Sequence, residues 1–318
     1  MTRLRYTILT FSVVLFSVAL GIALGGGPLQ GPVQGTLRSQ VGAVSDNGSD
    51  QVALLRENRT LQATAKFDRG FAQALSGDLL DDQLAGTSTV VLALPGVSPG
   101  VTKAVSGDIA DAGGTVTTTL QVGPQLVDPT ARPLVDELSK RLLEDMDDVQ
   151  VPDNASVYTR AGMVLSRALV TADDGGEPMD DPARSVFNTL TTAKLLSGAE
   201  PDQRAGSAVV LLPQATHRQD SSGGRGLILT ELLAAVDDAS DDVVVAGPPS
   251  SAAPRGLLGY VRTSASTAED VSTVDSLDAR AGQLVTVLAL AEQIGGDMGH
   301  YGVAAGADAL LPEDELTP

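Results

Sequence analysis

The chain has 318 residues, with 40 acidic and 21 basic side chains and a formal net charge of −19. So acidic a surface repels nucleic acid, whose binding needs a basic footprint, and nucleic-acid binding is therefore excluded. Because the chain has no cysteine, disulfides, thiolate nucleophiles and thiolate metal sites are excluded as well. The length suffices for one large domain or two small ones.

Residues 1–25 predict a transmembrane anchor or a signal segment. The stretch 6–24 carries no charge and follows Arg3 and Arg5. About 20 apolar residues span a bilayer as a helix, and the basic residues keep the N-terminus in the cytoplasm. A cleavable signal peptide is the alternative, since Gly21-Ile22-Ala23 offers small residues to a peptidase. Either segment exports the rest of the chain, so we expect the body on the extracytoplasmic side.

Residues 26–85 predict a helical stalk. Apolar side chains recur every three or four residues on both sides of a polar tetrapeptide: Leu37, Val41, Val44, Leu54, Leu55 and Leu61. The tetrapeptide Asp46-Asn47-Gly48-Ser49 interrupts the pattern, so we expect a second helix capped by Ser49 or Asp50. The stalk is predicted as a short coiled coil, or as a lone helix packed on the domain. The interruption argues against a long coiled coil.

Residues 86–172 predict a first α/β lobe. Two runs rich in β-branched residues, Ser88–Leu94 and Thr115–Val122, read as strands. Three helices are expected between and after them: Pro99–Ala112, Pro129–Met146 with Asp128 as its cap, and Ser156–Leu169. Strands that alternate with helices are typical of a parallel sheet covered by helices, so the predicted fold class is α/β.

An acidic linker, residues 173–182, precedes a second α/β lobe, residues 183–306, and a loose tail, residues 307–318. The second lobe repeats the pattern of alternating elements. Its predicted elements are helix Ala183–Leu196, strand Ser207–Leu212, helix Gly226–Ala239, strands Asp242–Ala246 and Leu257–Arg262, and the buried helix Leu284–Ile294. The similar segments VVLALPG and AVVLLPQ leave open that the body consists of two related lobes.

One motif suggests catalysis. Gly96-Val97-Ser98-Pro99-Gly100 fits the G-x-S-x-G nucleophile elbow and stands between a predicted strand and helix. In that motif the residue after the nucleophile donates its backbone N–H to the oxyanion, and Pro99 has none. The chain also has only two histidines. We therefore expect no enzyme, and an exported hydrolase is the least favoured alternative.

The segment after the buried helix holds candidate metal ligands. Met298 and His300 place a thioether and an imidazole two residues apart, next to Asp297. Both groups suit copper ions, so these three residues form the predicted metal site. The alternative is a tight glycine-rich turn in which His300 and Tyr301 are hydrogen-bonded. No tightly bound cofactor is expected.

Residues 272–302, STVDSLDARAGQLVTVLALAEQIGGDMGHYG, resemble the actinobacterial copper transporter family, the MctB-like proteins. The apolar segment that ends in ALG and the stalk with its LRSQ agree with that resemblance. The resemblance implies copper efflux and copper homeostasis at the cell envelope, through a pore in the outer membrane. Since a single helix encloses no channel, we expect a homo-oligomer. The alternative is a membrane-anchored scaffold or binding module that transports no ion.

Overall fold

The computed structural model describes residues 30–214, 224–240 and 242–312, and it describes side chains from Val52 on. The chain divides into two compact units, Met1–Phe67 and Asp68–Pro318. The predicted membrane or signal segment, residues 1–25, lies outside the described residues. Within the described ranges, none of the helices combines the length and the hydropathy that a membrane span needs.

The predicted stalk is one helix, α2 (Gln30–Leu80), which continues into the second unit from Asp68 on. The expected interruption at Asp46-Asn47-Gly48-Ser49 is wrong, because α2 runs through these residues without a break. Each of them lowers helix propensity by only about 1 kcal/mol or less, and good helix formers follow them at residues 53–57.

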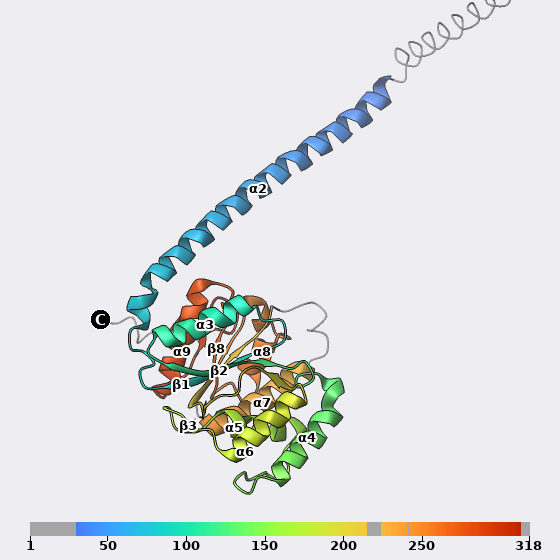
Figure 1. Cartoon of the computed structure of the whole chain (residues 1–318). Helices are drawn as coiled ribbons and strands as arrows, with labels where there is room; N and C mark the ends of the chain where they lie inside the picture. The colour runs from blue at the N-terminus through green and yellow to red at the C-terminus, as the bar shows by residue number, and fades with distance from the viewer. Residues whose placement is uncertain (1–29, 215–223, 241, 313–318) are drawn as a thin grey trace, which may run out of the picture. The chain divides into compact units, whose positions relative to one another are not determined.

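Within the described residues, seven strands form one sheet (Figure 1). Their order across the sheet is β4 (Leu196–Ser197), β2 (Thr115–Val122), β1 (Ser88–Ala93), β6 (Ser207–Leu211), β7 (Val243–Ala246), β8 (Ser272–Val274) and β9 (His300–Tyr301). All neighbours pair in parallel except β2 and β4. A separate antiparallel ribbon joins β3 (Glu177–Pro178) and β5 (Gln203–Arg204). The predicted α/β class is confirmed.

The central strands bury both of their faces. In β1, Val90 and Leu92 point into one hydrophobic cluster, while Val91 and Ala93 point into the other. Successive side chains of a strand point to opposite faces, so a continuous apolar run is needed where helices cover both sides. This requirement explains why the strands read as unbroken runs of Val, Leu and Ala.

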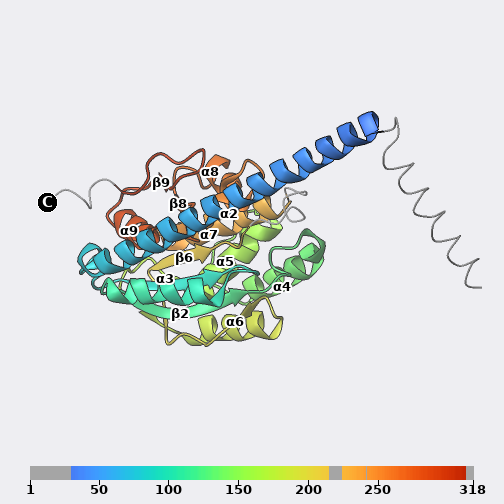
Figure 2. The same ribbon diagram turned by 90° about the horizontal axis from the view of Figure 1, so that it is seen from above.

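Helices cover both faces of the sheet, as the two views show (Figures 1 and 2). On one face lie α4 (Arg132–Glu144), α5 (Val157–Leu169), α6 (Asp181–Thr192), α7 (Gly224–Ser240) and α8 (Leu257–Thr263). On the other face lie α3 (Pro99–Asp111), α9 (Arg280–Ile294) and the end of α2, whose Leu80 is fully buried. Short 3-10 turns, η1 (Pro129–Ala131) and η2 (Pro249–Ala252), follow β2 and β7.

One element of the second lobe was predicted as the wrong type of secondary structure. Residues predicted as strand Leu257–Arg262 form helix α8 instead. Leu258, Val261 and Arg262 are buried, and their spacing of three and four is the helical period. A segment of six residues is too short to separate the helical from the strand period, so the strand prediction was wrong.

The two predicted lobes share a single sheet. Strand β1 of the first pairs directly with β6 of the second, Val91 opposite Val209. The acidic stretch 173–182 lies within the second compact unit, and its Asp174 carbonyl accepts a hydrogen bond from the backbone N–H of Ser88. The similar segments VVLALPG and AVVLLPQ therefore contain two neighbouring strands of one sheet, β1 and β6.

The strand order places a switch point between β1 and β6. From β1 the chain enters α3 on one face of the sheet, and from β6 it enters α7 on the other face. The central order β2-β1-β6-β7-β8 is the doubly wound order 2-1-3-4-5. In such sheets ligands bind in the crevice outside the carboxyl ends of the two strands at the switch point.

Candidate functional site

The predicted copper ligands lie at the edge of the sheet formed by β8 and β9. Asp297 is exposed, Met298 is half-buried, and His300, the first residue of β9, is buried. The backbone N–H of His300 donates to the exposed carboxylate of Asp308 at 3.2 Å. The structure therefore places a second carboxylate, from the turn after β9, next to the predicted histidine.

The His300 ring is held by the neighbouring strand. Its Nδ1 lies 3.0 Å from Thr273 Oγ1, which also accepts a hydrogen bond from Arg262 Nε at 2.8 Å. Burial lowers the pKa of His300, and the positive charge of Arg262 lowers this pKa further, against smaller raising effects of Asp308 and of backbone hydrogen bonds. The imidazole is therefore kept neutral, which is the form that binds metal ions. Metal binding through Nδ1 requires the hydrogen bond to Thr273 to open.

A buried ion pair supports this edge. Arg262 donates to Asp275 Oδ2 at 2.9 Å and to the carbonyl oxygen of Tyr301 at 2.9 Å. Asp275 also accepts hydrogen bonds from the backbone N–H groups of Val303 and Ala304. Arg262 belongs to α8 and donates to β8 and β9, while Asp275 follows β8 and accepts from the loop after β9. The pair therefore fixes α8, β8, β9 and this loop to one another.

Two further features shape the same edge. Tyr301 donates a hydrogen bond to Glu292, and burial raises the pKa of the Tyr301 hydroxyl, with a further rise from that carboxylate. Gly302 has φ +130°, and a side chain there would overlap the Asp275 carboxylate. Only glycine combines this backbone conformation with such close approach. Within the described ranges, no three His, Cys, Asp or Glu side chains are arranged to hold a metal ion.

A cleft of about 230 Å³ lies at the switch point. Its lining is mostly apolar and includes Val97, Ser98, Leu212, Gln214, Leu277 and Asp278. These residues follow the carboxyl ends of β1, β6 and β8, the edge where doubly wound sheets bind their ligands. None of the lining residues that the structure describes is basic.

Ser98, the residue of the suspected nucleophile elbow, stands at the rim of this cleft. Its Oγ accepts a hydrogen bond from the backbone N–H of Gly100 at 3.3 Å, the bond of a helix N-cap. Pro99 opens helix α3 and supplies no N–H for an oxyanion. The described histidine, His300, is committed to β8 through Thr273. Ser98 thus has the contacts of a capping residue.

Comparison with known proteins decides the family. The family model of the copper transport outer membrane protein MctB matches residues 1–312. The chain belongs to this family. The copper transporter MctB of Mycobacterium tuberculosis (strain ATCC 25618 / H37Rv) is 27% identical over 321 residues, which cover 96% of this chain and 98% of that protein. The copper transporter MctB of Mycobacterium leprae (strain TN) is 27% identical over 324 residues, 98% of this chain and 99% of that protein.

The resemblance found in residues 272–302 is thereby confirmed across nearly the whole chain. The MctB family is one of copper transport in the outer membrane, and it is not an enzyme family. The predicted placement in the cell envelope agrees with that description.

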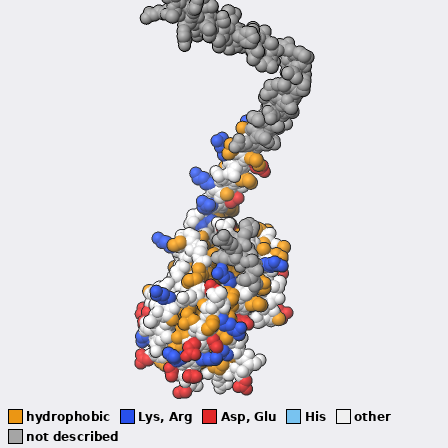
Figure 3. Space-filling view, turned by 90° about the vertical axis from the view of Figure 1, so that its right-hand side faces the viewer, with side chains coloured by type: hydrophobic (Ala, Val, Ile, Leu, Met, Phe, Trp, Pro, Cys, Tyr) orange, Lys and Arg blue, Asp and Glu red, His pale blue; other side chains and the backbone are white. Residues whose placement is uncertain are grey.

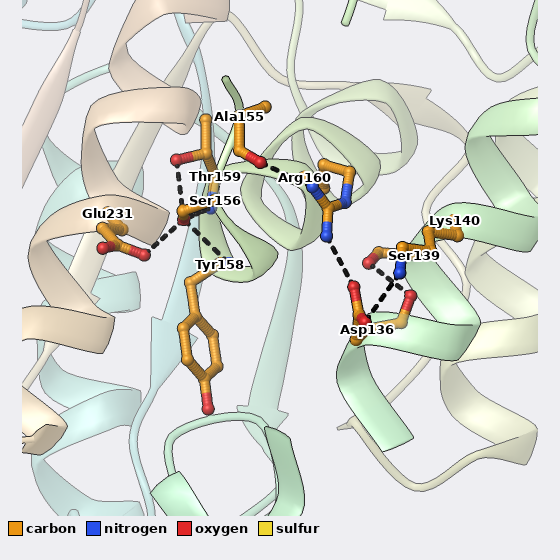
Figure 4. Close-up of polar contacts among 9 residues, drawn as sticks. All are labelled: Asp136, Ser139, Lys140, Ala155, Ser156, Tyr158, Thr159, Arg160 and Glu231. Carbon is orange, nitrogen blue, oxygen red and sulfur yellow. Dashed lines mark hydrogen bonds and ion pairs between the residues drawn. The ribbon is translucent and has the colours of Figure 1, made fainter. Parts of the chain in front are cut away.

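A polar cluster in the MctB-like body lies between α5 and α7 (Figure 4). Ser156 caps α5 by accepting from the backbone N–H groups of Tyr158 and Thr159, at 3.1 and 3.0 Å. Its hydroxyl also donates to Glu231 Oε2 of α7 at 2.5 Å. Among the described residues, the buried Tyr158 hydroxyl has no hydrogen-bond partner, and burial raises its pKa. Figure 4 shows the Tyr158 ring pointing away from Ser156 and Glu231.

The same cluster extends to α4 through Arg160. This guanidinium donates to Asp136 Oδ1 and to the carbonyl oxygen of Ala155, both at 2.5 Å. Asp136 also accepts from Lys140 at 2.8 Å, so hydrogen bonds from both cations lower the pKa of the Asp136 carboxyl. The network joins the three neighbouring helices α4, α5 and α7.

Sequence reasoning missed three parts of these sites. Arg262 and Asp275 gave no signal because a single Arg and a single Asp read as ordinary surface charges. Asp308 lay in a segment predicted as loose. The cleft at the switch point depends on strand order, which no local pattern carries. One usable signal existed, because a proline stands two residues after the end of β1, β6 and β7, at Pro95, Pro213 and Pro248.

Proposed function

We propose that this chain carries copper ions across the outer membrane and thereby keeps intracellular copper low. The observation that supports the proposal most is the match of the copper transport family model to residues 1–312. The mycobacterial relatives named copper transporter MctB add to it, because their similarity extends over 96% or more of the chain.

The proposal includes how the chain is placed and assembled. The charge-free stretch 6–24 holds the chain at a membrane, and the acidic body lies on the extracytoplasmic side. Several copies assemble, since one helix per chain encloses no path for an ion. This homo-oligomer and the helical anchor rest on the residues of the N-terminal region and on the transport role.

Asp297, Met298 and His300 remain the proposed copper ligands. Their support is chemical, because thioether and neutral imidazole groups bind copper ions. The buried, neutral His300 and the exposed carboxylates of Asp297 and Asp308 lie at one edge of the sheet. With few ligands the site binds copper weakly, as a transport path requires, since the ion must leave as well as enter.

Deletion of the gene tests the proposed transport. The deletion strain is expected to be sensitive to copper and to accumulate it, while its sensitivity to zinc stays unchanged. Complementation with the native gene restores resistance, and His300→Ala or Met298→Ala expressed at the same level does not. Unchanged copper sensitivity and unchanged cell copper in the deletion strain would remove the transport role. Full resistance with His300→Ala would remove the proposed ligand alone.

The cleft at the switch point favours a second candidate, an envelope binding module without ion transport. Its place at the carboxyl ends of β1 and β6 is where doubly wound sheets bind small molecules. Val101→Trp fills this cleft from helix α3 and leaves residues 297–300 unchanged. The binding module would be favoured if Val101→Trp keeps copper resistance but shows a different envelope defect of the deletion strain.

A further inference from the structure

Helix α2 has described side chains in the first unit from Val52 to Phe67, and all of them are exposed. The exposed fractions of Leu54, Leu55 and Leu61 are 64%, 54% and 62%. Figure 3 shows hydrophobic side chains beside Lys and Arg along the coloured part of this helix. In proteins a helix gains most of its stability by burying an apolar face against a partner. Three exposed leucines within eight residues therefore indicate a surface that a partner covers.

The spacing of these residues identifies the kind of partner. Leu54 and Leu61 lie one heptad apart, and Asn58 and Ala65 occupy the alternate positions four residues after each leucine. This is the d-a-d-a order of a coiled-coil seam, with leucine at both d positions. Arg56, Arg59 and Ala63 lie on other faces of the helix, as the 3.6-residue period requires. A seam built on heptads fits another helix of the same pattern.

Asn58 narrows the choice to a second copy of this chain. A single asparagine at an a position costs stability but fixes the register and the number of helices, because it pairs best with the same residue opposite. The side-chain amide of Gln62 donates to Asn58 Oδ1 at 2.7 Å, which leaves the Asn58 NH₂ group to donate across the seam. A partner without asparagine at this position would cover the exposed Asn58 amide and leave it without that pairing.

We infer that Leu54, Asn58, Leu61 and Ala65 form the seam of a parallel coiled coil between copies of this chain. The inference rests on the proposed function, because anchors in one membrane require the copies to run in the same direction. It adds the surface and the register of the oligomer: Asn58 lies opposite Asn58, and each leucine lies opposite the same leucine of the second copy.

The cysteine-free chain gives a direct test. Leu61→Cys or Leu54→Cys is introduced into the full chain in detergent micelles, and disulfide formation is followed under mild oxidation. In the parallel seam each new cysteine faces itself, so both variants are expected to cross-link at least tenfold faster than Ala63→Cys. Ala63 is the matched control, since it is exposed on the opposite face of the same helical turn. Equal cross-linking rates at 61 and 63 would overturn the seam.

A second measurement does not depend on cross-linking. Leu54→Glu with Leu61→Glu is expected to weaken self-association of the full chain at least about a hundredfold in sedimentation equilibrium. Arg56→Glu with Ala63→Glu adds the same side chains outside the seam and is expected to change it less than about threefold. Unchanged assembly of the first variant overturns the seam and leaves the proposed oligomer standing. A native chain that stays monomeric overturns both.

Copper resistance is read separately, by complementation of the deletion strain. A chain that cross-links at position 61 in cells yet restores no copper resistance supports the seam and counts against the transport role. If Leu54→Glu with Leu61→Glu restores copper resistance although this variant no longer assembles, transport is supported. The dependence of transport on the oligomer is then overturned. A cross-link at position 61 to a different protein overturns the choice of partner.

Discussion

Arg262 and Asp275 form an ion pair whose side chains are 3% and 0% exposed. Removing one partner of such a pair leaves an uncompensated buried charge, which costs about 3–5 kcal/mol. We therefore expect Arg262→Met to lower the free energy of unfolding by about 3–5 kcal/mol, measured by urea denaturation. Asp275→Asn is expected to act in the same direction, because Asp275 also accepts from two backbone N–H groups.

An exposed pair in the same protein serves as the control. Arg141 and Glu137 are 71% and 72% exposed, and exposed pairs contribute about 0–1 kcal/mol. Arg141→Met should change the free energy of unfolding by less than about 1 kcal/mol. If Arg262→Met costs no more than Arg141→Met, the buried network does not hold the β8–β9 edge together.

Two glycines within helices should respond in opposite directions to alanine. A Cβ at Gly162 of α5 would lie 2.6 Å from Ala235 Cβ and 2.9 Å from the Leu232 carbonyl oxygen of α7. Gly162→Ala is therefore expected to destabilise the fold by about 1–3 kcal/mol through overpacking. At Gly107 of α3 a Cβ meets nothing within 4 Å, so Gly107→Ala should stabilise by up to about 1 kcal/mol. Thermal unfolding of both variants checks the pair, and equal signs would contradict the α5–α7 packing.

The sequence predicted buried elements better than their arrangement. The helix Leu284–Ile294 was identified correctly because leucine, valine and alanine occur on all its sides, and α9 is buried as expected. Strands β1, β2, β6 and β7 were likewise apparent from their β-branched runs. Segments of two or three residues, such as β8 and β9, carry too few side chains to show a period, so they were missed.

The candidate sites were less accessible to sequence reasoning. His300 was singled out as a rare residue, yet its neighbours Arg262 and Thr273 come from 38 and 27 residues earlier in the chain. The order of strands that forms the cleft depends on which helices can cover which face. Which helix covers which face depends on packing throughout the core, so no local sequence motif predicts it.

Asp180 should make acid stability depend on one identified carboxyl. Hydrogen bonding from Arg167 lowers the pKa of Asp180 below 3.8, against the opposing effect of burial. Its contribution is therefore fully present above pH 3.8 and is lost as the pH falls through the lowered pKa. Asp180→Asn keeps an acceptor for the cap of α6, so it should cost less than about 1 kcal/mol at pH 7.

The pH dependence of that difference is the decisive measurement. The gap in unfolding free energy between the native chain and Asp180→Asn should be constant between pH 7 and pH 6 and should shrink toward pH 2. Asp181→Asn is the control, since the Asp181 side chain is 100% exposed. A gap that grows as the pH falls would have the wrong sign for a stabilising carboxylate.

The two serine caps should differ in strength. Ser156 accepts from two backbone N–H groups and donates to Glu231, whereas Ser98 accepts one longer bond at an exposed position. We expect Ser156→Ala to cost about 2 kcal/mol and Ser98→Ala about 0.5 kcal/mol. Urea denaturation compares the two. A larger loss at Ser98 would show that this residue has contacts beyond the cap.

The pairing of β1 with β6 also constrains how the body folds. Thr89 and Ser207, whose hydroxyls lie 2.9 Å apart, are separated by 118 residues. Pairing of such distant segments is slow, because a long loop must close before any contact forms. During synthesis, β1 has its outer neighbour β2 early, but its inner edge stays open until more than 200 residues have been made. Until β6 has been made, a nascent chain exposes the unpaired edge of the apolar strand β1. The centre of the sheet can form only after that.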